Sequence, residues 1–316
     1  MSLSLLLVLS FRIMFYNCEN LLFSQGHTYE KLTNLSRVIV AAGEGEPPAI
    51  IGLAEVENDS ILTRWTKHTP LARWHYEYLI SHSSDERGIN VALLYQKEEF
   101  RLLGHEFVRV TLPKNFRPTR DLLHAWGRIV NGDTLDVVVV HLPSRYNGKK
   151  TSDRARKIAH EKLKMLMDSV CSIRSKPHLI VMGDFNDYPT SSSIKEDFSD
   201  YVNLMFPLQK DLWKNPDKLG SHKHQGEWGF LDQFFVNKEL LEEKELEDST
   251  IYKKDSTIYN NVRAKNPRSF ALPFMLIKDK KYLGLRPKRS RYGSVYEGGY
   301  SDHLPILLDV FVEMKK

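Results

Sequence analysis

Cysteine and long apolar runs are scarce in this chain of 316 residues. There are 2 cysteines, Cys18 and Cys171, so at most one disulfide can form and a disulfide framework is excluded. No cysteine or histidine spacing has the pattern of a structural zinc site. Both cysteines lie in apolar runs, which predicts buried free thiols. No apolar run approaches the roughly 18 residues that a membrane-spanning helix needs.

Several catalytic signatures are missing as well. The chain contains no glycine-rich phosphate loop, no GxSxG nucleophile motif and no paired Cys–His nucleophile pattern. Charge is close to balanced, with 45 lysines and arginines against 40 aspartates and glutamates and a net charge of +5. This mild excess is compatible with a phosphate-bearing partner, and it suits plain solubility equally well. Charge alone therefore selects no function class.

The first ten residues allow more than one interpretation. Leu3–Leu9 reads LSLLLVL, which resembles the apolar part of a secretory signal. No basic residue precedes this run, however, and no small-residue cleavage site follows it. Residues 1–10 are a signal remnant, vector-derived sequence or the beginning of a first strand. The compartment therefore stays open between an exported and a cytoplasmic protein.

Short apolar runs that predict buried strands alternate with segments of helical spacing. Asn131 and Gly132 join two of these runs and give the strongest hairpin signal of the chain. Hairpins beside crossover helices favour a layered α/β sandwich, and with no evident linker residues 11–316 are predicted to form one domain. We expect strands at 11–17, 49–56, 74–80, 89–95, 122–130, 134–140, 179–182, 230–236 and 306–311, and helices at 29–42, 58–68 and 151–173.

Polar side chains that can carry chemistry follow directly after several of these apolar strands. A carboxylate at the end of a buried strand is unfavourable unless it is paired or bound to a metal. A single residue of this kind is readily a cap or a turn former, but a whole set has a common cause. Glu and Asp oxygens suit Mg²⁺ or Mn²⁺, whereas Asn and His supply neutral donors or a proton carrier. The set comprises Asn17, Glu55, His141, Asp184, Asn186, Asp232, Asp302 and His303.

Segments spread over nearly the whole chain resemble the motifs of the endonuclease/exonuclease/phosphatase superfamily, which is deoxyribonuclease I-like. MGDFND at 182–187 and GGYSDHLPI at 298–306 are together specific for it. The resemblance implies a four-layer α/β sandwich, in which two mixed β-sheets pack face to face with helices outside. It also implies metal-dependent hydrolysis of a phosphoester at the sheet edges. The other segments are FYNCENLL (15–22), GLAEVEN (52–58), RGINVALLY (87–95), HLPSR (141–145) and WGFLDQFFV (228–236).

The resemblance assigns a metal site to three residues of the set. Glu55 matches the principal metal-ligand glutamate of the superfamily, although Ala54 stands where members more often have Gln. Asn17 matches the asparagine that lies beside the metal, and Asp302 resembles a second metal ligand. Mg²⁺ is the expected cofactor, with Mn²⁺ as a substitute.

The resemblance also assigns the hydrolytic chemistry. Asp184 is expected to orient or deprotonate the attacking water, and Asn186 to hold a phosphate oxygen. Their two-residue spacing places both side chains on one side of an extended segment. Asp232 and His303 are expected to form a carboxylate–imidazole pair, which fixes the ring and raises its basicity. Whether His303 acts as a general base or binds the phosphoryl group stays open.

The resemblance also implies weaker assignments for four further residues. His141 is expected to be a catalytic acid paired with a glutamate, for which Glu86 is the candidate. Arg120 and Arg145 are expected to reach the phosphate of the substrate.

Substrate class is the least determined property. Lys278–Arg291 interleaves cations with tyrosines, which suits a nucleic-acid backbone but also a solvated loop. Ala271–Ile277 is apolar and is interpreted as a core strand rather than a membrane-contact loop. The sequence favours a Mg²⁺-dependent phosphodiesterase, most simply a nuclease. The alternative is a phosphomonoesterase acting on an inositol, sugar or lipid phosphate. A non-catalytic binding module is disfavoured because no catalytic residue is missing. We expect a monomer without a stable protein partner.

Overall fold

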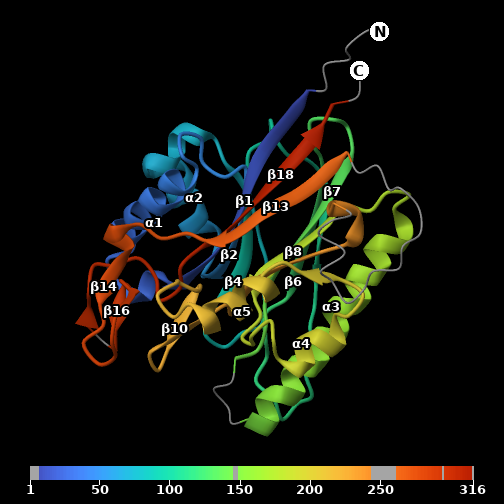
Figure 1. Ribbon diagram of the computed structural model, residues 1–316. Coiled ribbons are helices and arrows are strands. Elements are labelled where there is room, and N and C mark those ends of the chain that lie inside the picture. Colours follow the sequence, from blue (N-terminus) through green and yellow to red (C-terminus); the bar gives the residue numbers. More distant parts are fainter. Residues whose placement is uncertain (1–6, 145–148, 243–260, 294, 315–316) are drawn as a thin grey trace.

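Two six-stranded β-sheets packed against each other form the centre of the molecule in the computed structural model (Figure 1). The structure describes residues 7–144, 149–242, 261–293 and 295–314. Helices α1 (Thr28–Ala42) and α2 (Asp59–His68) cover one sheet, and α3 (Lys149–Ile173) covers the other. Helix, sheet, sheet and helix thus make the four-layer α/β sandwich that the sequence predicts.

The first sheet carries both ends of the described chain. The sheet is mixed, because β1 runs parallel to β2 and antiparallel to β18. Its strands lie in the order β13 (Val262–Ser269), β18 (Ile306–Glu313), β1 (Val8–Leu21), β2 (Ile50–Val56), β4 (Asn90–Tyr95) and β3 (Glu77–Ile80).

The second sheet is mixed in the same way, with β7 parallel to β8 and the other pairs antiparallel. The predicted hairpin is confirmed, because β6 pairs with β7 across the turn at Asn131 and Gly132. Its strands lie in the order β5 (Arg101–Val108), β6 (Leu122–Arg128), β7 (Thr134–His141), β8 (Leu179–Asp184), β12 (Asp232–Val236) and β9 (Val202–Asn203).

Alternation of side chains along the strands divides the apolar residues among three cores. Phe15 of β1 and Met182 of β8 belong to the core between the sheets. Tyr16, the next residue of β1, points the other way and packs in the core under α1 and α2. Val138 of β7 does the same on the opposite side, under α3. Both faces of each central strand are therefore buried, which explains why these strands read as continuous apolar runs.

The amino-terminal segment contributes to the first sheet from Val8 onward. Val8, Leu9 and Ser10 pair with Glu313, Val312 and Phe311 of β18. These residues of the ambiguous segment 1–10 are thus strand, whereas residues 1–6 lie outside the described part of the chain.

Two edge strands and one interior assignment differ from expectation. The sequence analysis missed β5 and β13, because RLLGHEFV and VRAKNPRS show little of the apolar pattern of buried strands. Pro267 lies where the register of β13 against β18 shifts, as is usual for proline in an edge strand. Ala271–Ile277 is not a core strand: its middle is the 3-10 turn Pro273–Met275, and Ile277 is exposed.

Among the described residues, no helix is long and apolar enough to cross a membrane. Both cysteines are free; Cys18 is buried as expected, whereas Cys171 is partly exposed.

Several short helices and strands lie outside the two large sheets. They are the helices α4 (Ser192–Asp197) and α5 (Phe206–Lys214), and the ribbons β10 (His222–His224) with β11 (Glu227–Gly229), β14 (Leu276–Lys278) with β15 (Leu285–Pro287), and β16 (Arg291–Tyr292) with β17 (Val295–Tyr296).

Gly183 allows β7 and β8 to approach closely just before the polar end of the sheet. A Cβ at Gly183 would lie 2.2 Å from the backbone oxygen of Val140, its partner in the register. Because this contact is with backbone, it cannot relax cheaply. We expect Gly183→Ala to lower the free energy of unfolding by about 1–3 kcal/mol. Urea titration measures this as a lower midpoint at unchanged slope, and an unchanged midpoint would contradict the packing described here.

Candidate active site

The predicted polar residues gather where strands of both sheets end. Asn17 and Glu55 come from β1 and β2 of the first sheet. His141 and Asp184 end the parallel neighbours β7 and β8, where they stand opposite each other in the register. Asp232 begins β12 and is paired with Asp184. The remaining members are Asn186, just after β8, and Asp302 and His303, in the loop before β18.

Irregularities in β1 and β2 aim the side chains of the first sheet into this site. The pairing of β1 with β2 shifts between Asn17 and Leu21, and that of β2 with β4 shifts at Glu55. Glu55 has a φ of 64°, and Glu19, Asn20 and Asn186 have φ near 50°. Left-handed conformations at non-glycine residues are strained and cluster at functional sites. Bulges of this kind redirect a side chain next to an active site.

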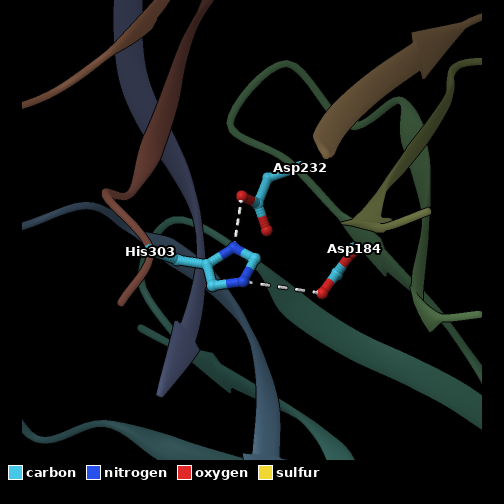
Figure 2. Close-up of side chains that lie close together, drawn as sticks. All are labelled: Asp184, Asp232 and His303. Atoms are coloured by element: carbon cyan, nitrogen blue, oxygen red, sulfur yellow. Dashed lines mark hydrogen bonds and ion pairs between the residues drawn. The ribbon is translucent and has the colours of Figure 1, made fainter. Parts of the chain in front are cut away.

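His303 lies between two aspartates (Figure 2). Its Nδ1 is 2.7 Å from Asp232 Oδ2, and its Nε2 is 3.9 Å from Asp184 Oδ2. Burial disfavours the charged ring, but the Asp232 carboxylate outweighs burial and holds the pKa of His303 well above its usual value. At neutral pH His303 is therefore an imidazolium. The predicted carboxylate–imidazole pair is present in the structure.

Asp184 is fixed by two neutral donors. Asn17 Nδ2 donates to Asp184 Oδ2 at 3.1 Å, and the backbone N–H of Asn186 donates to Oδ1 at 2.9 Å. Burial, together with the charge of Asp232, raises the pKa of Asp184 to about 7 despite the opposing charge of His303. A carboxylate of such pKa is well matched to accepting a proton near neutral pH.

His141 also lies close to two carboxylates of the site, those of Asp184 and Glu55. Its Nε2 lies 3.6 Å from Asp184 Oδ2 and 3.9 Å from Glu55 Oε1. Burial, reinforced by the nearby Arg120 and Arg87 charges, lowers the pKa of His141 well below its usual value. The ring is therefore neutral at pH 7, which does not favour the predicted role of a catalytic acid.

Glu86 is not the partner of His141. Its side chain is 59% exposed, and its Oε2 lies 3.7 Å from Arg117 Nε. The neighbouring residue Asp85 points inward instead, with Oδ2 3.1 Å from Arg120 Nη1. The predicted pairing of Glu86 with His141 is wrong, because in a loop the inward direction of a side chain does not follow from spacing, and the carboxylates near His141 are Asp184 and Glu55.

We expect Glu86→Gln to change kcat/KM by less than about twofold, as is usual for exposed positions. The measurement is steady-state hydrolysis of a phosphoester by the variant and by the unaltered chain. A loss beyond about tenfold would return Glu86 to the site, since a catalytic acid–base partner contributes more than that.

The two predicted substrate arginines have different outcomes. Arg120 is buried and donates from Nε and Nη2 to the backbone oxygens of His141 and Leu142, while Nη1 bonds Asp85. It therefore positions His141 and has little freedom to follow a substrate. Arg145 lies outside the described residues. Arg87, which was not predicted, lies with Nη1 3.8 Å from Glu55 Oε1 and is half-exposed.

Asn186 retains a position suited to its predicted role. Its Nδ2 donates to the backbone oxygen of Leu142 at 2.9 Å, which orients the amide beside Asp184. Asp187 has other partners: its carboxylate accepts from Tyr188 N and Ser193 Oγ and lies 3.9 Å from Arg156 Nε.

Glu55 fits a hard metal ion by its donor atoms, whereas Asn17 Oδ1 already accepts from the backbone N–H of Glu19 at 3.0 Å and has one lone pair left for a metal. Glu55 Oε2 accepts from the backbone N–H of Asn20 at 2.7 Å, whereas Oε1 accepts no hydrogen bond from a described residue. Its side chain is 12% exposed, so a nearly buried carboxylate oxygen faces the site without a donor. Such an oxygen is a suitable ligand for a divalent cation. Asp184, Asp232 and His303 form a second, fully buried group of potential ligand atoms within 4.8 Å of one another.

Asp302 does not fit the predicted metal role in the same way. Its Oδ2 accepts from Arg289 Nη2 at 3.0 Å, and Arg289 Nε donates to Glu19 Oε1 at 2.8 Å. The sequence analysis singled out neither Glu19 nor Arg289 for this site. Glu19 could have been found, because it stands two residues after Asn17 on the same strand.

His222 of β10 was also missed. Its ring packs against that of His303 at a tilt of 42°, with 4.7 Å between the centroids, and its backbone bridges to His303. Burial and the His303 charge lower the pKa of His222 to about 4, so a neutral ring packs against the imidazolium.

A cavity of about 530 Å³ is lined by Arg87, Arg117, Asn115 and Phe116 together with the buried Arg120. Two of these residues connect it with the site, because Arg87 lies near Glu55 and Arg120 bonds the backbone of His141. The cavity provides room for a polyanionic group beside these arginines.

Comparison with known proteins identifies relatives of this architecture. A family model described as "Endonuclease/Exonuclease/phosphatase family" matches residues 23–315. The human Nocturnin catalytic domain with bound sulfate is 17% identical at a TM-score of 0.60, covering 96% of this chain and 97% of that one. Humanized D. rerio TDP2 is 15% identical at a TM-score of 0.58, covering 95% and 98%. A mannosyl-6-phosphatase of Bacteroides thetaiotaomicron VPI-5482 is 14% identical at 0.57, covering 95% and 99%.

These structural likenesses establish the fold, because their sequence identities are low. A comparison with curated proteins finds no match.

Proposed function

Because the chain belongs to the endonuclease/exonuclease/phosphatase family and is thus a phosphoric ester hydrolase, we propose that it is a Mg²⁺-dependent phosphodiesterase acting on nucleic acid. The family is generally dependent on a divalent metal. One domain, residues 11–316, carries the whole site in this proposal and acts as a monomer.

The observation that carries the diester proposal is the distribution of charge around Glu55. Arg87 lies beside Glu55 and lines the cavity together with Arg117 and Asn115. Arg87 is about half-exposed and Arg117 is exposed, so their charges can reach the neighbouring phosphates of a polyanionic diester.

The ionisation states support a division of labour among the chain's own residues. His303 is an imidazolium held by Asp232, so it suits binding a phosphoryl oxygen better than accepting a proton. Asp184, with a pKa of about 7, is the better base for the attacking water. Asn186 would donate its second amide hydrogen to another phosphoryl oxygen, the first being bonded to the backbone oxygen of Leu142. Neutral His141, held by Arg120, packs beside Asp184 and Glu55 and excludes bulk water from them.

Glu55 and Asn17 would hold the metal in this proposal. When bound, Mg²⁺ supplies charge that stabilises the phosphoryl oxygens as negative charge develops. Glu55→Gln should therefore weaken metal binding, because an amide oxygen is a poorer ligand for a hard cation than a carboxylate.

The alternative is a phosphomonoesterase that acts on a sugar, inositol or lipid phosphate. It is favoured by the likeness to the mannosyl-6-phosphatase, which is as extensive as the likeness to TDP2. A fluorescently labelled oligonucleotide and a panel of sugar and inositol monophosphates, each with Mg²⁺, separate the two. Cleavage within the oligonucleotide supports the diester proposal. Phosphate release from monoesters alone would overturn it in favour of the alternative.

A further inference from the structure

Arg289 bridges two carboxylates at the edge of the candidate active site. Its Nε donates to Glu19 Oε1 at 2.8 Å, and its Nη2 donates to Asp302 Oδ2 at 3.0 Å. Asp302 directly precedes His303, and Glu19 lies two residues after Asn17. The guanidinium therefore lies in the place where two acidic side chains would otherwise face each other, next to the residues assigned to catalysis.

The carboxylate of Glu19 accepts its remaining hydrogen bonds from the protein as well. The backbone N–H and the Oγ of Ser290 donate to Glu19 Oε2 at 2.7 and 2.8 Å. Lys31, which is 6% exposed, donates from Nζ to Ser290 Oγ at 2.8 Å and to the backbone oxygen of Glu19. Both carboxylate oxygens of Glu19 are thus engaged without a metal.

Charge is balanced within this group. Glu19 and Asp302 carry two negative charges, and Arg289 and Lys31 carry two positive charges. A dication added between the carboxylates would have to displace the guanidinium, or it would leave an excess of positive charge beside the buried Glu19 and Lys31. Guanidinium is also the cation best suited to bridging, because its planar fork holds two carboxylates with fixed geometry.

Resting on the proposed function, we propose that Arg289 is a built-in cation that takes the place of a second metal ion, so that the enzyme binds a single metal at Glu55. Asp302 then anchors Arg289 beside His303 and is not a metal ligand. The same assignment removes Arg289 from the basic segment 278–291 that the sequence suggested as a nucleic-acid contact. Arg289 is a positioning residue that supplies permanent positive charge next to the phosphoryl site.

Counting bound Mn²⁺ tests this proposal without reference to turnover. Electron paramagnetic resonance of free Mn²⁺ during titration of the full chain gives the number of sites and their Kd. We expect one Mn²⁺ in the unaltered chain and one in Asp302→Asn, with Kd changed less than about threefold because the amide oxygen still accepts from Arg289. Glu55→Gln should lose that single site.

Two outcomes would overturn the proposal. One is a second Mn²⁺ in the unaltered chain, which lies at Asp302 if it is absent from Asp302→Asn and elsewhere, as at the group of Asp184, Asp232 and His303, if it persists. The other is a single Mn²⁺ whose Kd rises more than about tenfold in Asp302→Asn, which would make Asp302 a direct ligand.

Arg289→Met provides a second arm, in which the two carboxylates should gain an additional Mn²⁺ that disappears when Asp302→Asn is added. The conservative variant Arg289→Lys should keep the count at one. A chain that binds one Mn²⁺ but cleaves no diester would contradict the proposed substrate and leave this inference standing, so the two failures are distinguishable.

Discussion

Replacing Asp184 with asparagine should lower kcat at least about 100-fold, because general-base catalysis contributes this much or more. Asparagine keeps the size of the side chain and can still accept from the backbone N–H of Asn186, but it cannot take a proton. The fold should therefore persist while turnover is lost. Steady-state hydrolysis with saturating substrate and Mg²⁺ measures the effect.

Asp187→Asn is the matched control. Asp187 lies on the same loop, but its carboxylate bonds Tyr188 N and Ser193 Oγ, away from the site. We expect this variant to keep kcat within about threefold, as for residues without a role in the transition state. If Asp184→Asn kept more than about a tenth of the activity, Asp184 could not be the base.

Replacing His303 with alanine should also lower kcat at least about 100-fold, because a fixed cation that binds a phosphoryl oxygen acts mainly on the transition state. The variant also leaves Asp232 buried without its partner, since Asp232 Oδ1 already lacks a hydrogen bond from a described residue. Circular dichroism and the thermal midpoint check that the chain still folds. Turnover near that of the unaltered chain would exclude His303 from the mechanism.

Asp232→Asn distinguishes the imidazolium role of His303 from a base role. Without the Asp232 charge, burial dominates and the pKa of His303 falls. If the charged ring is the active form, activity disappears as pH rises through this pKa, so the alkaline limb of the pH profile moves to lower pH. The acidic limb moves to lower pH in either case, because Asp184 also loses the Asp232 charge that raises its pKa. If neutral His303 were the base, the alkaline limb would not move to lower pH, so the behaviour of that limb in kcat/KM decides between them.

The strand-end carboxylates and histidines could be predicted because burying so many polar groups is unfavourable in free energy unless they are paired or share one site. The central strands were predictable for a related reason, since burial on both faces leaves an uninterrupted apolar run. The edge strands β5 and β13 have polar faces and irregular pairing, and the sequence gives no comparable signal for them.

Side-chain direction in loops and bulges was not predictable. Glu86 and Asp85 are adjacent, and which of them turns inward depends on Arg120, a residue of another segment. Glu19 is far from Arg289 in the sequence, and no sequence pattern links Arg289 with Asp302. Arg289 was therefore interpreted only as part of the basic segment 278–291. Long-range ion pairs of this kind become visible only when the sheets are assembled.

The most direct test of the account is hydrolysis of bis-p-nitrophenyl phosphate and p-nitrophenyl phosphate measured side by side. The assay is run with Mg²⁺, with EDTA, and with Asp184→Asn in place of the unaltered chain. For a Mg²⁺-dependent phosphodiesterase with Asp184 as its base, we predict preferential cleavage of the diester. EDTA should abolish this cleavage, added Mg²⁺ should restore it, and Asp184→Asn should lack it. Diester cleavage that survives EDTA, or a preference for the monoester, would contradict it.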